Sequence, residues 1–264
     1  MNNTMGKVYL VGGGPGDPEL LTLKAYRVID QADVLVYDRL VSQDIVDIAP
    51  AGCSRIFVGK AAGNHTMPQE EINDLLVKLA RTNHKVVRLK GGDPYIFGRG
   101  SEEALHLSQH DVPFEIVPGI TAAAGISAAT GIPLTHRALA SGVKFVTGHG
   151  KGDEDLDLDW KSLADVQTTI VIYMGLGKLQ TLSDELINAG LSPDTPAVAI
   201  SNGTMANQRQ CASTLGKLPD AVKAIDLKPP VLCMIGHVVS LSHALNWQGL
   251  SYEDQKGQNA QASA

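Results

Sequence analysis

The sequence predicts an α/β protein of two domains, the first built on a mainly parallel sheet and the second on a mixed sheet. Strand-like and helix-like segments alternate through the first half, which is typical of a parallel sheet covered by helices on both faces. Fewer helix-like segments intervene after Gly190, so consecutive strands there can pair antiparallel. A length of 264 residues suits one large domain or two modest ones.

In the first half, short apolar runs predict strands, and apolar residues at helical spacing predict helices. The clearest helix covers residues 69–81, where Ile72, Leu75 and Leu79 share one face. Strands are predicted at residues 7–11, 34–37, 55–58, 86–89 and 114–117, and helices at residues 19–31, 42–48, 69–81, 101–109 and 121–129. Right-handed crossovers place the carboxyl ends of parallel strands along one edge, so the residues that follow these strands are expected to meet there.

The second half has its own pattern. Residues 131–137 contain Gly131 and Pro133 and are interpreted as a linker. Beyond it, strands are predicted at residues 143–147, 169–174, 196–201, 208–213 and 230–235, and a helix at residues 176–189. The predicted domains are residues 1–135 and 136–247, with a ligand between them. Residues 248–264 are polar and small, which predicts a disordered tail.

Composition and charge argue against several classes of protein. The net charge of −6 disfavours a nucleic-acid partner, since such proteins carry a basic surface. Cys53, Cys211 and Cys233 are far apart and form no CxxC pair, which favours a reduced, cytoplasmic setting. No apolar run reaches about 18 residues, so no membrane span is expected. The eight histidines are interpreted as dispersed, without the H-x-x-x-H spacing of a metal site, so no metal is expected.

Two glycine-rich loops follow predicted strands and indicate a ligand site. Residues 12–18 read GGGPGDP, and residues 90–100 read KGGDPYIFGRG. Glycine lets a ligand approach the backbone closely, because no Cβ stands in the way. The first loop is not a dinucleotide fingerprint, because Asp17 occupies the third glycine position, and it lacks the Gly-Lys-Ser/Thr of a phosphate loop. Two such loops at one sheet edge predict a site for a small organic ligand.

Several other residues have both an ordinary and a functional interpretation. Asp38 follows a predicted strand, where a turn or capping aspartate is more common than a functional carboxylate. Lys60 reads first as a surface lysine, Arg137 as a solvated linker charge, and Met174 as a core residue. Arg99 lies between two glycines, which favours a guanidinium that is presented rather than buried. Residue type alone leaves these alternatives open.

The ordered set of motifs resembles the tetrapyrrole methylases, and within them the uroporphyrinogen-III C-methyltransferases. The matching segments are residues 11–18, 37–40, 59–60, 88–94, 97–100, 102–103, 117–122, 131–137, 147–149, 173–175 and 202–204. Any one of these segments is a weak signal. Their occurrence in order, over about residues 6–245, is highly specific.

The resemblance implies the tetrapyrrole methylase fold, with S-adenosylmethionine in the cleft between two α/β domains, and a homodimer. It implies that uroporphyrinogen III is methylated at C2 and C7 to give precorrin-2 through precorrin-1, for sirohaem and cobalamin synthesis, with S-adenosylhomocysteine as the by-product. A sulfonium methyl is already activated, so this chemistry requires no metal. Because Met1 leads directly into the first strand, the dehydrogenase and chelatase domain that precedes this unit in some relatives is not expected.

The same resemblance assigns roles to individual positions. The catalytic candidates are Asp38, Lys60 and Arg99. The cofactor-binding candidates are Pro15, Gly91, Gly92, Asp93, Ile96, Thr121, Ala122, Met174 and Gly203. The substrate-binding candidates are Arg99, Glu102, Arg137 and Met174. Uroporphyrinogen carries eight carboxylates, and arginine pairs with a carboxylate through two parallel hydrogen bonds, which suits Arg99 and Arg137.

Two alternatives stand beside this interpretation. A methylase of the same fold can act on a later corrinoid or on a protein residue. Glycine loops alone would also allow a non-catalytic nucleotide-binding module, although Asp38, Lys60 and Arg99 would then have no purpose. Methyl transfer from labelled cofactor to uroporphyrinogen separates the three possibilities.

Overall fold

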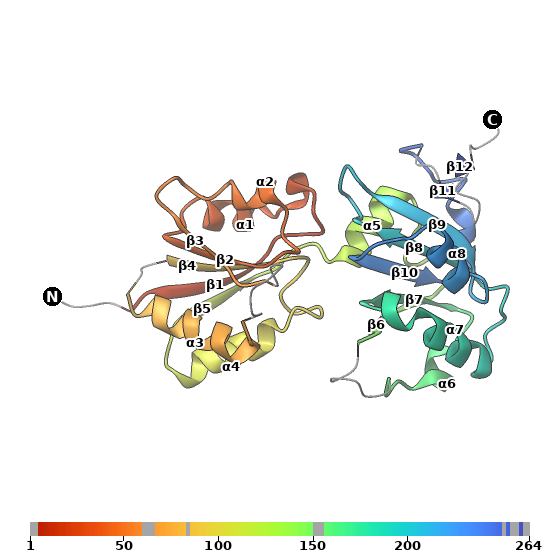
Figure 1. Ribbon diagram of the computed structural model, residues 1–264, viewed down its shortest axis with the longest axis horizontal. Helices are drawn as coiled ribbons and strands as arrows, with labels where there is room; N and C mark the ends of the chain where they lie inside the picture. Colours follow the sequence, from red (N-terminus) through yellow and green to blue (C-terminus); the bar gives the residue numbers. More distant parts are fainter. Residues whose placement is uncertain are drawn as a thin grey trace. The chain divides into compact units, whose positions relative to one another are not determined.

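The computed structural model describes residues 5–59, 67–82, 85–149 and 156–249, together with the backbone of residues 252–253 and 259–260. The chain forms two compact units, Met1–Ala122 and Ala123–Ala264, each with its own sheet (Figure 1). The boundary falls at the start of helix α5 (Ala122–Thr130), before the position at residue 135 that the sequence predicts. Contacts explain the difference, because the Ala123 N–H donates to the Tyr173 hydroxyl, 3.1 Å away in the second unit.

The first unit contains a five-stranded sheet in which every pairing is parallel, which confirms the prediction of a mainly parallel sheet. Its strands are β1 (Lys7–Gly12), β2 (Val34–Tyr37), β3 (Ser54–Phe57), β4 (Lys85–Lys90) and β5 (Phe114–Val117). Their spatial order is β3-β2-β4-β1-β5. The chain therefore moves outward from β1 to β3 and then returns to β4 and β5, so that β1 and β4 meet at a switch point.

Helices cover both faces of this sheet (Figure 1). They are α1 (Leu23–Ile29), α2 (Gln43–Val46), α3 (Gln69–Ala80) and α4 (Gly100–Gln109), with the 3-10 turn η1 (Pro18–Leu20) before α1. Ile29 and Ile45 pack with Leu89 in the core beneath α1 and α2. Leu76 and Leu107 pack with Val36 in the core beneath α3 and α4. The single helix predicted at residues 19–31 is divided because Thr22 caps α1, accepting the Ala25 N–H at 3.0 Å.

The second unit contains a mixed sheet, as the sequence predicts. Its strands are β6 (Gly142–Thr147), β7 (Thr168–Tyr173), β8 (Pro196–Ser201), β9 (Arg209–Thr214), β10 (Val231–Ile235), β11 (Tyr252–Glu253) and β12 (Asn259–Ala260). They are arranged β12-β11-β9-β8-β10-β7-β6, and only the β6–β7 and β9–β11 pairs are parallel. The strands β11 and β12 lie within the tail predicted to be disordered; its disorder stays a prediction.

Helices α6 (Trp160–Leu163), α7 (Leu179–Asn188) and α8 (Leu218–Ala224) share one hydrophobic core with this sheet. The 3-10 turns η2 (Leu176–Lys178) and η3 (His237–Leu241) follow β7 and β10. Neither α6 nor α8 was predicted from the sequence. The first turn of α8 contains Pro219, a residue that fits only the start of a helix. Among the described residues, no helix is long and apolar enough to span a membrane.

An ion-pair cluster joins α1 to the amino-terminal ends of β1 and β5. Lys7 Nζ lies 2.5 Å from Glu115 Oε2, and Lys24 Nζ contacts Glu115 Oε1. Hydrogen bonds from Lys24 and Lys7 lower the pKa of Glu115 from 4.5 to about 2. The cluster therefore stabilises the fold above pH 4.5, and its contribution is lost as the pH falls toward 2.

We expect Glu115→Gln to make the stability of the chain less sensitive to acid. The difference in urea midpoint between wild type and variant should shrink as the pH falls from about 6 to about 3, because acid removes the same charge that the substitution removes. The three charged groups are partly exposed. The difference in the free energy of unfolding between wild type and variant should therefore stay below about 1 kcal/mol at neutral pH, and it should vanish in about 1 M salt. A difference that is constant across this pH range would contradict the expectation.

Candidate active site

The two glycine loops meet at the switch point of the first sheet. Gly13 N–H donates to Lys90 O at 2.7 Å. Gly14 and Gly92 then exchange two backbone hydrogen bonds, of 3.1 and 2.6 Å. Both glycines have a left-handed φ, of +72° and +68°, which explains why glycine occupies these positions. Loops that are 78 positions apart thus form one surface at the carboxyl ends of β1 and β4.

A third loop, after β5, packs against these two. Gly119 N–H donates to Asp93 Oδ2 at 3.0 Å. A Cβ on Gly119 would lie 2.2 Å from Gly92 O and 2.8 Å from the Gly12 Cα, so no larger residue fits. Asp93 Oδ1 also accepts the Tyr95 N–H at 2.8 Å. The carboxylate of Asp93 therefore fastens the loop after β4 to the loop after β5.

Gly92 faces the loop that follows β5. A Cβ on Gly92 would meet nothing closer than 3.8 Å, and its nearest neighbours would be Thr121 and Ala122. Gly91 is closed on its own side by Leu40, whose Cβ would lie 2.8 Å from an added Cβ. The predicted cofactor residues of this unit, which are Pro15, Gly91, Gly92, Asp93, Ile96, Thr121 and Ala122, thus belong to one group of loops. A glycine-lined edge at the switch point of a parallel sheet is typical of a site for a small organic ligand.

Asp38 lies beside these loops, at the end of β2. Its Oδ1 accepts the Leu40 N–H at 3.0 Å, which is the turn bond of the ordinary interpretation. Its Oδ2 accepts from Arg88 Nη2 at 3.2 Å. The side chain is 25% exposed, so the carboxylate remains accessible at the edge of the sheet. Asp38 therefore combines the geometry of a turn residue with that of a fixed, accessible carboxylate.

A buried charged cluster, formed by Arg88, Lys90 and Glu103, holds Asp38 in place. No role was predicted for this cluster from the sequence. Glu103 Oε1 accepts from Arg88 Nε at 3.0 Å and from Lys90 Nζ at 2.8 Å. All three side chains are at most 5% exposed. Burial and the neighbouring Arg88 lower the pKa of Lys90, and Glu103 opposes this shift. The signal in the sequence was the pair Arg88 and Lys90 on either side of Leu89, at the end of a run that begins with two valines, which the periodicity of a buried strand does not explain.

Arg99 is presented to solvent, in agreement with the sequence prediction, with 56% of its side chain exposed. A Cβ on either flanking glycine would come within 2.7 Å of Pro94 O, so close packing rather than flexibility requires Gly98 and Gly100. Arg99 has a left-handed φ of 58° at the start of α4. Its guanidinium pairs with Glu102 through bonds of 2.9 and 2.7 Å, and this pair raises the pKa of Arg99.

Lys60, the remaining catalytic candidate of this unit, lies outside the described residues. Its predicted role stays a prediction.

The second unit carries three of the predicted site residues. Met174 follows β7 with a φ of 54° and is 52% exposed, so the interpretation as a core residue is wrong. Gly203 follows β8, and a Cβ there would lie 2.2 Å from the Ile126 side chain. Asn202 and Thr204 beside it also have a left-handed φ, of 49° and 70°. Strained backbone at two strand ends is typical of functional loops. Arg137 is exposed.

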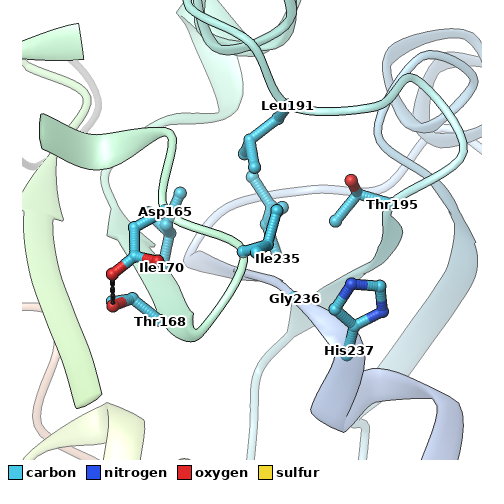
Figure 2. A pocket seen from close by; sticks show the side chains of 9 residues that line it. Asp165, Thr168, Ile170, Leu191, Thr195, Ile235, Gly236 and His237 are labelled. Atoms are coloured by element: carbon cyan, nitrogen blue, oxygen red, sulfur yellow. Dashed lines mark hydrogen bonds between the residues drawn. The ribbon is translucent and has the colours of Figure 1, made fainter. Parts of the chain in front are cut away.

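The pocket drawn in Figure 2 lies at the edge of the second sheet where β7 begins, opposite to the edge that carries Met174 and Gly203. Its lining includes Thr168, where β7 begins, whereas Met174 follows the end of that strand. His237 and the Asp165–Thr168 hydrogen bond of 2.7 Å face the pocket, which has a volume of about 10 Å³. This is room for one water molecule, so the pocket is not a site for a substrate.

The prediction that no two histidines have the H-x-x-x-H spacing is wrong. His106 and His110 on α4 do have the H-x-x-x-H spacing, and His106 Nε2 lies 2.9 Å from Asp74 Oδ1. Their rings pack with centroids 4.3 Å apart, and His110 Nδ1 lies 2.8 Å from His106 O. Within the described ranges, no three His, Cys, Asp or Glu side chains are placed to hold a metal ion.

Comparison with known proteins identifies relatives that match most of this chain. Residues 7–219 match the family model of the "Tetrapyrrole (Corrin/Porphyrin) Methylases". A siroheme synthase of Nitrosomonas europaea is 54% identical over 242 residues, which are 92% of this chain and 51% of that protein. The chain thus spans about half the length of the curated relatives that it matches.

Solved structures of two enzymes carry the same architecture. The uroporphyrin III C-methyl transferase of Thermus thermophilus is 41% identical, has a TM-score of 0.77, and aligns over 89% of this chain and 94% of its own. A second structure of that enzyme is complexed with S-adenyl homocysteine. A cobalt precorrin-4 methyltransferase is 30% identical, with a TM-score of 0.78 over 88% of this chain and 95% of its own. The fold class expected from the sequence is confirmed.

Proposed function

Because this chain belongs to the tetrapyrrole methylases, we propose that it transfers methyl groups from S-adenosylmethionine to C2 and C7 of uroporphyrinogen III. The product is precorrin-2, formed through precorrin-1. The observation that carries the proposal is the group of three glycine loops at one sheet edge, with the Asp38 carboxylate beside them. The greater identity to the uroporphyrin III enzyme, 41% against 30% for the cobalt precorrin-4 enzyme, favours this substrate.

The glycine loops have the properties of a cofactor site. The backbone around Gly91 and Gly92 and the loop at Thr121 and Ala122 would hold S-adenosylmethionine, because these loops are joined at one sheet edge and glycine lets a ligand approach the backbone closely. Pro15, Asp93 and Ile96 would complete this part of the site. Met174 and Gly203 of the second unit are the other residues that we propose to bind the cofactor. When bound, the cofactor supplies an electrophilic methyl group. The task of the loops is to orient it toward the pyrrole carbon at near-attack distance.

Asp38 is the proposed proton acceptor. When a pyrrole carbon attacks the methyl group of the cofactor, the macrocycle gains a positive charge and must then lose a proton. A carboxylate beside the macrocycle stabilises this charge and accepts the proton. The Leu40 N–H and Arg88 hold one oxygen each, so the carboxylate has a single orientation. Lys60 is proposed as a second acid/base residue.

Arg99 and Arg137 are the proposed contacts for the carboxylates of the macrocycle. A guanidinium forms two parallel hydrogen bonds with a carboxylate, which fixes orientation as well as position. Glu102 holds the Arg99 fork in one rotamer through its paired bonds. Arg99 is therefore pre-oriented at the start of α4, and a substrate carboxylate would share or replace the partner that Glu102 provides.

Arg99→Lys is expected to preserve the fold and lower kcat/KM for uroporphyrinogen III by about ten-fold or more, because a lysine cannot form the two-point contact. Steady-state kinetics with S-adenosylmethionine at saturation would measure the loss. The control is Lys178→Arg, which exchanges the same two residue types, in the reverse direction, at a position in the second unit. It should leave kcat/KM unchanged. Near-normal kcat/KM in Arg99→Lys would remove Arg99 from the substrate site.

Mass spectrometry tests the proposed function directly. The chain is incubated with uroporphyrinogen III and methyl-labelled S-adenosylmethionine under reducing conditions, and the methyl groups added to the macrocycle are counted. Two methyls at C2 and C7 are the expected result. Transfer only to a later corrinoid would point to the alternative methylase, and cofactor binding without transfer to any tetrapyrrole would favour a nucleotide-binding module.

The family also leads us to propose a cytoplasmic homodimer with no nucleic-acid or membrane partner. Light scattering on the purified chain would test the dimer, with a mass twice that of the 27.9 kDa chain as the expected result.

A further inference from the structure

We infer that Glu103 is a positioning residue for methyl transfer, which fixes the Asp38 carboxylate through Arg88 and fixes Arg99 through the first turn of α4. The inference rests on the proposed function, because it depends on Asp38 taking part in the reaction. Its basis is the set of contacts made by one fully buried carboxylate.

Glu103 is the centre of a network that reaches three elements. Its Oε1 accepts from Arg88 Nε and Lys90 Nζ on β4, and from Gln69 Nε2 on α3 at 3.1 Å. Glu103 itself belongs to the first turn of α4. A single carboxylate thus ties the amino-terminal end of α4 to the carboxyl end of β4, where the glycine loop begins.

Arg88 transmits this constraint to Asp38. Its Nε donates to Glu103, its Nη1 donates to Leu89 O at 3.0 Å, and its Nη2 donates to Asp38 Oδ2. Each nitrogen of the guanidinium is therefore engaged, and the plane of the group cannot rotate without breaking a bond. The side chain of Glu103 therefore constrains the position of Asp38 Oδ2 through two consecutive hydrogen bonds, both made by the Arg88 guanidinium.

The α4 backbone transmits the constraint to Arg99. The N–H groups of Glu102 and Glu103 donate to Arg99 O at 3.1 and 3.3 Å. Arg99 has the left-handed conformation at the helix start, and its side chain pairs with Glu102. The hydrogen bonds of the Glu103 carboxylate therefore fix the position of the first turn of α4 on the sheet. The Arg99 guanidinium is fixed together with this turn.

Stability alone does not account for this arrangement. Glu103 is 0% exposed, and its Oε2 accepts no hydrogen bond from any residue the structure describes. A buried charge with an unused oxygen is costly, and well-packed apolar residues often stabilise a fold as well as a buried ion pair does. A role in orienting the reacting groups gives a reason for the cluster that packing does not provide.

A double-mutant cycle tests the inference. Wild type, Glu103→Gln, Asp38→Ala and the double variant are compared by kcat, with the concentration of active sites set by titration with S-adenosylhomocysteine. Glu103→Gln is expected to lower kcat at least ten-fold with KM for S-adenosylmethionine changed less than two-fold. In the Asp38→Ala background the same substitution should lower kcat less than two-fold, since Asp38 is absent and a displaced Arg99 is expected to raise KM for uroporphyrinogen III rather than lower kcat at saturation. Glu115→Gln, the same exchange at an ion-pair cluster elsewhere on the sheet, should leave kcat unchanged.

The outcomes separate the possible failures. An equal loss in both backgrounds, or an unchanged kcat per active site in Glu103→Gln, would overturn the inference and leave the proposed function standing. A wild-type chain that does not methylate uroporphyrinogen III would overturn both. If Glu103→Gln does not fold, Arg88→Lys is used in the same cycle. It keeps the buried cation but cannot reach both carboxylates, so it is expected to show the same dependence on Asp38 and to overturn the inference if its loss is additive.

Discussion

Replacing Asp38 with alanine is expected to reduce kcat by about 100-fold or more, because a positioned acid or base contributes about 10²–10⁴-fold to a reaction. The affinity for S-adenosylmethionine should change less than about two-fold, since the glycine loops are held by bonds that do not involve Asp38. Single-turnover kinetics measures the chemical step, and calorimetry with S-adenosylhomocysteine measures cofactor affinity.

Asp38→Asn is the matched control, because it separates the turn from the chemistry. Its side-chain oxygen can still accept the Leu40 N–H, which the wild-type Oδ1 accepts at 3.0 Å, but it cannot take a proton from the macrocycle. We expect Asp38→Asn to be almost as slow as Asp38→Ala. If Asp38→Asn turned over at the wild-type rate, Asp38 would be a turn residue and not the proton acceptor.

Gly119→Ala is expected to lower the affinity for S-adenosylhomocysteine by about ten-fold or more. The new Cβ would lie 2.2 Å from Gly92 O and 2.8 Å from the Gly12 Cα, and backbone cannot move aside as a flexible side chain can. The loops after β1, β4 and β5 would therefore separate, and overpacking of this kind costs about 1–3 kcal/mol. Calorimetry gives the affinity, and thermal melting gives the stability of the variant.

Gly52→Ala makes the same chemical change at a glycine of the same unit where a Cβ would meet nothing within 4 Å. It should leave both the affinity and the melting temperature almost unchanged. Normal binding of S-adenosylhomocysteine by Gly119→Ala would mean that the junction of these three loops does not form part of the cofactor site.

Local pattern was sufficient to predict most strands and the helices that follow them. The apolar face of α3 and the short Val-rich and Ile-rich runs are readable because burial follows the period of each element. The sequence did not reveal that the helix predicted at residues 19–31 is divided at Thr22, because an interior threonine and a capping threonine read alike. It also missed α8, which is short and has Pro219 in its first turn.

The candidate site was predicted in part. Glycine loops and the residues after strand ends are local signals, and they led to Asp38, Gly92 and Arg99. Met174 was read as a core residue because residue type favours burial, whereas its left-handed backbone turns it outward at the end of β7. Arg88, Lys90 and Glu103 were left without a role, because their significance depends on partners distant in the sequence.

The sequence by itself determined most of the elements, the position of the glycine loops and the family, since each depends on residues that are near one another in the chain or on the order of motifs. Only the tertiary structure decided which of these segments are neighbours. Strand order places β2 next to β4, so Asp38 pairs with Arg88 across 50 positions, and α4 then brings Glu103 to the same guanidinium. Such contacts follow from the topology of the sheet, which the periodicity of a single strand does not encode.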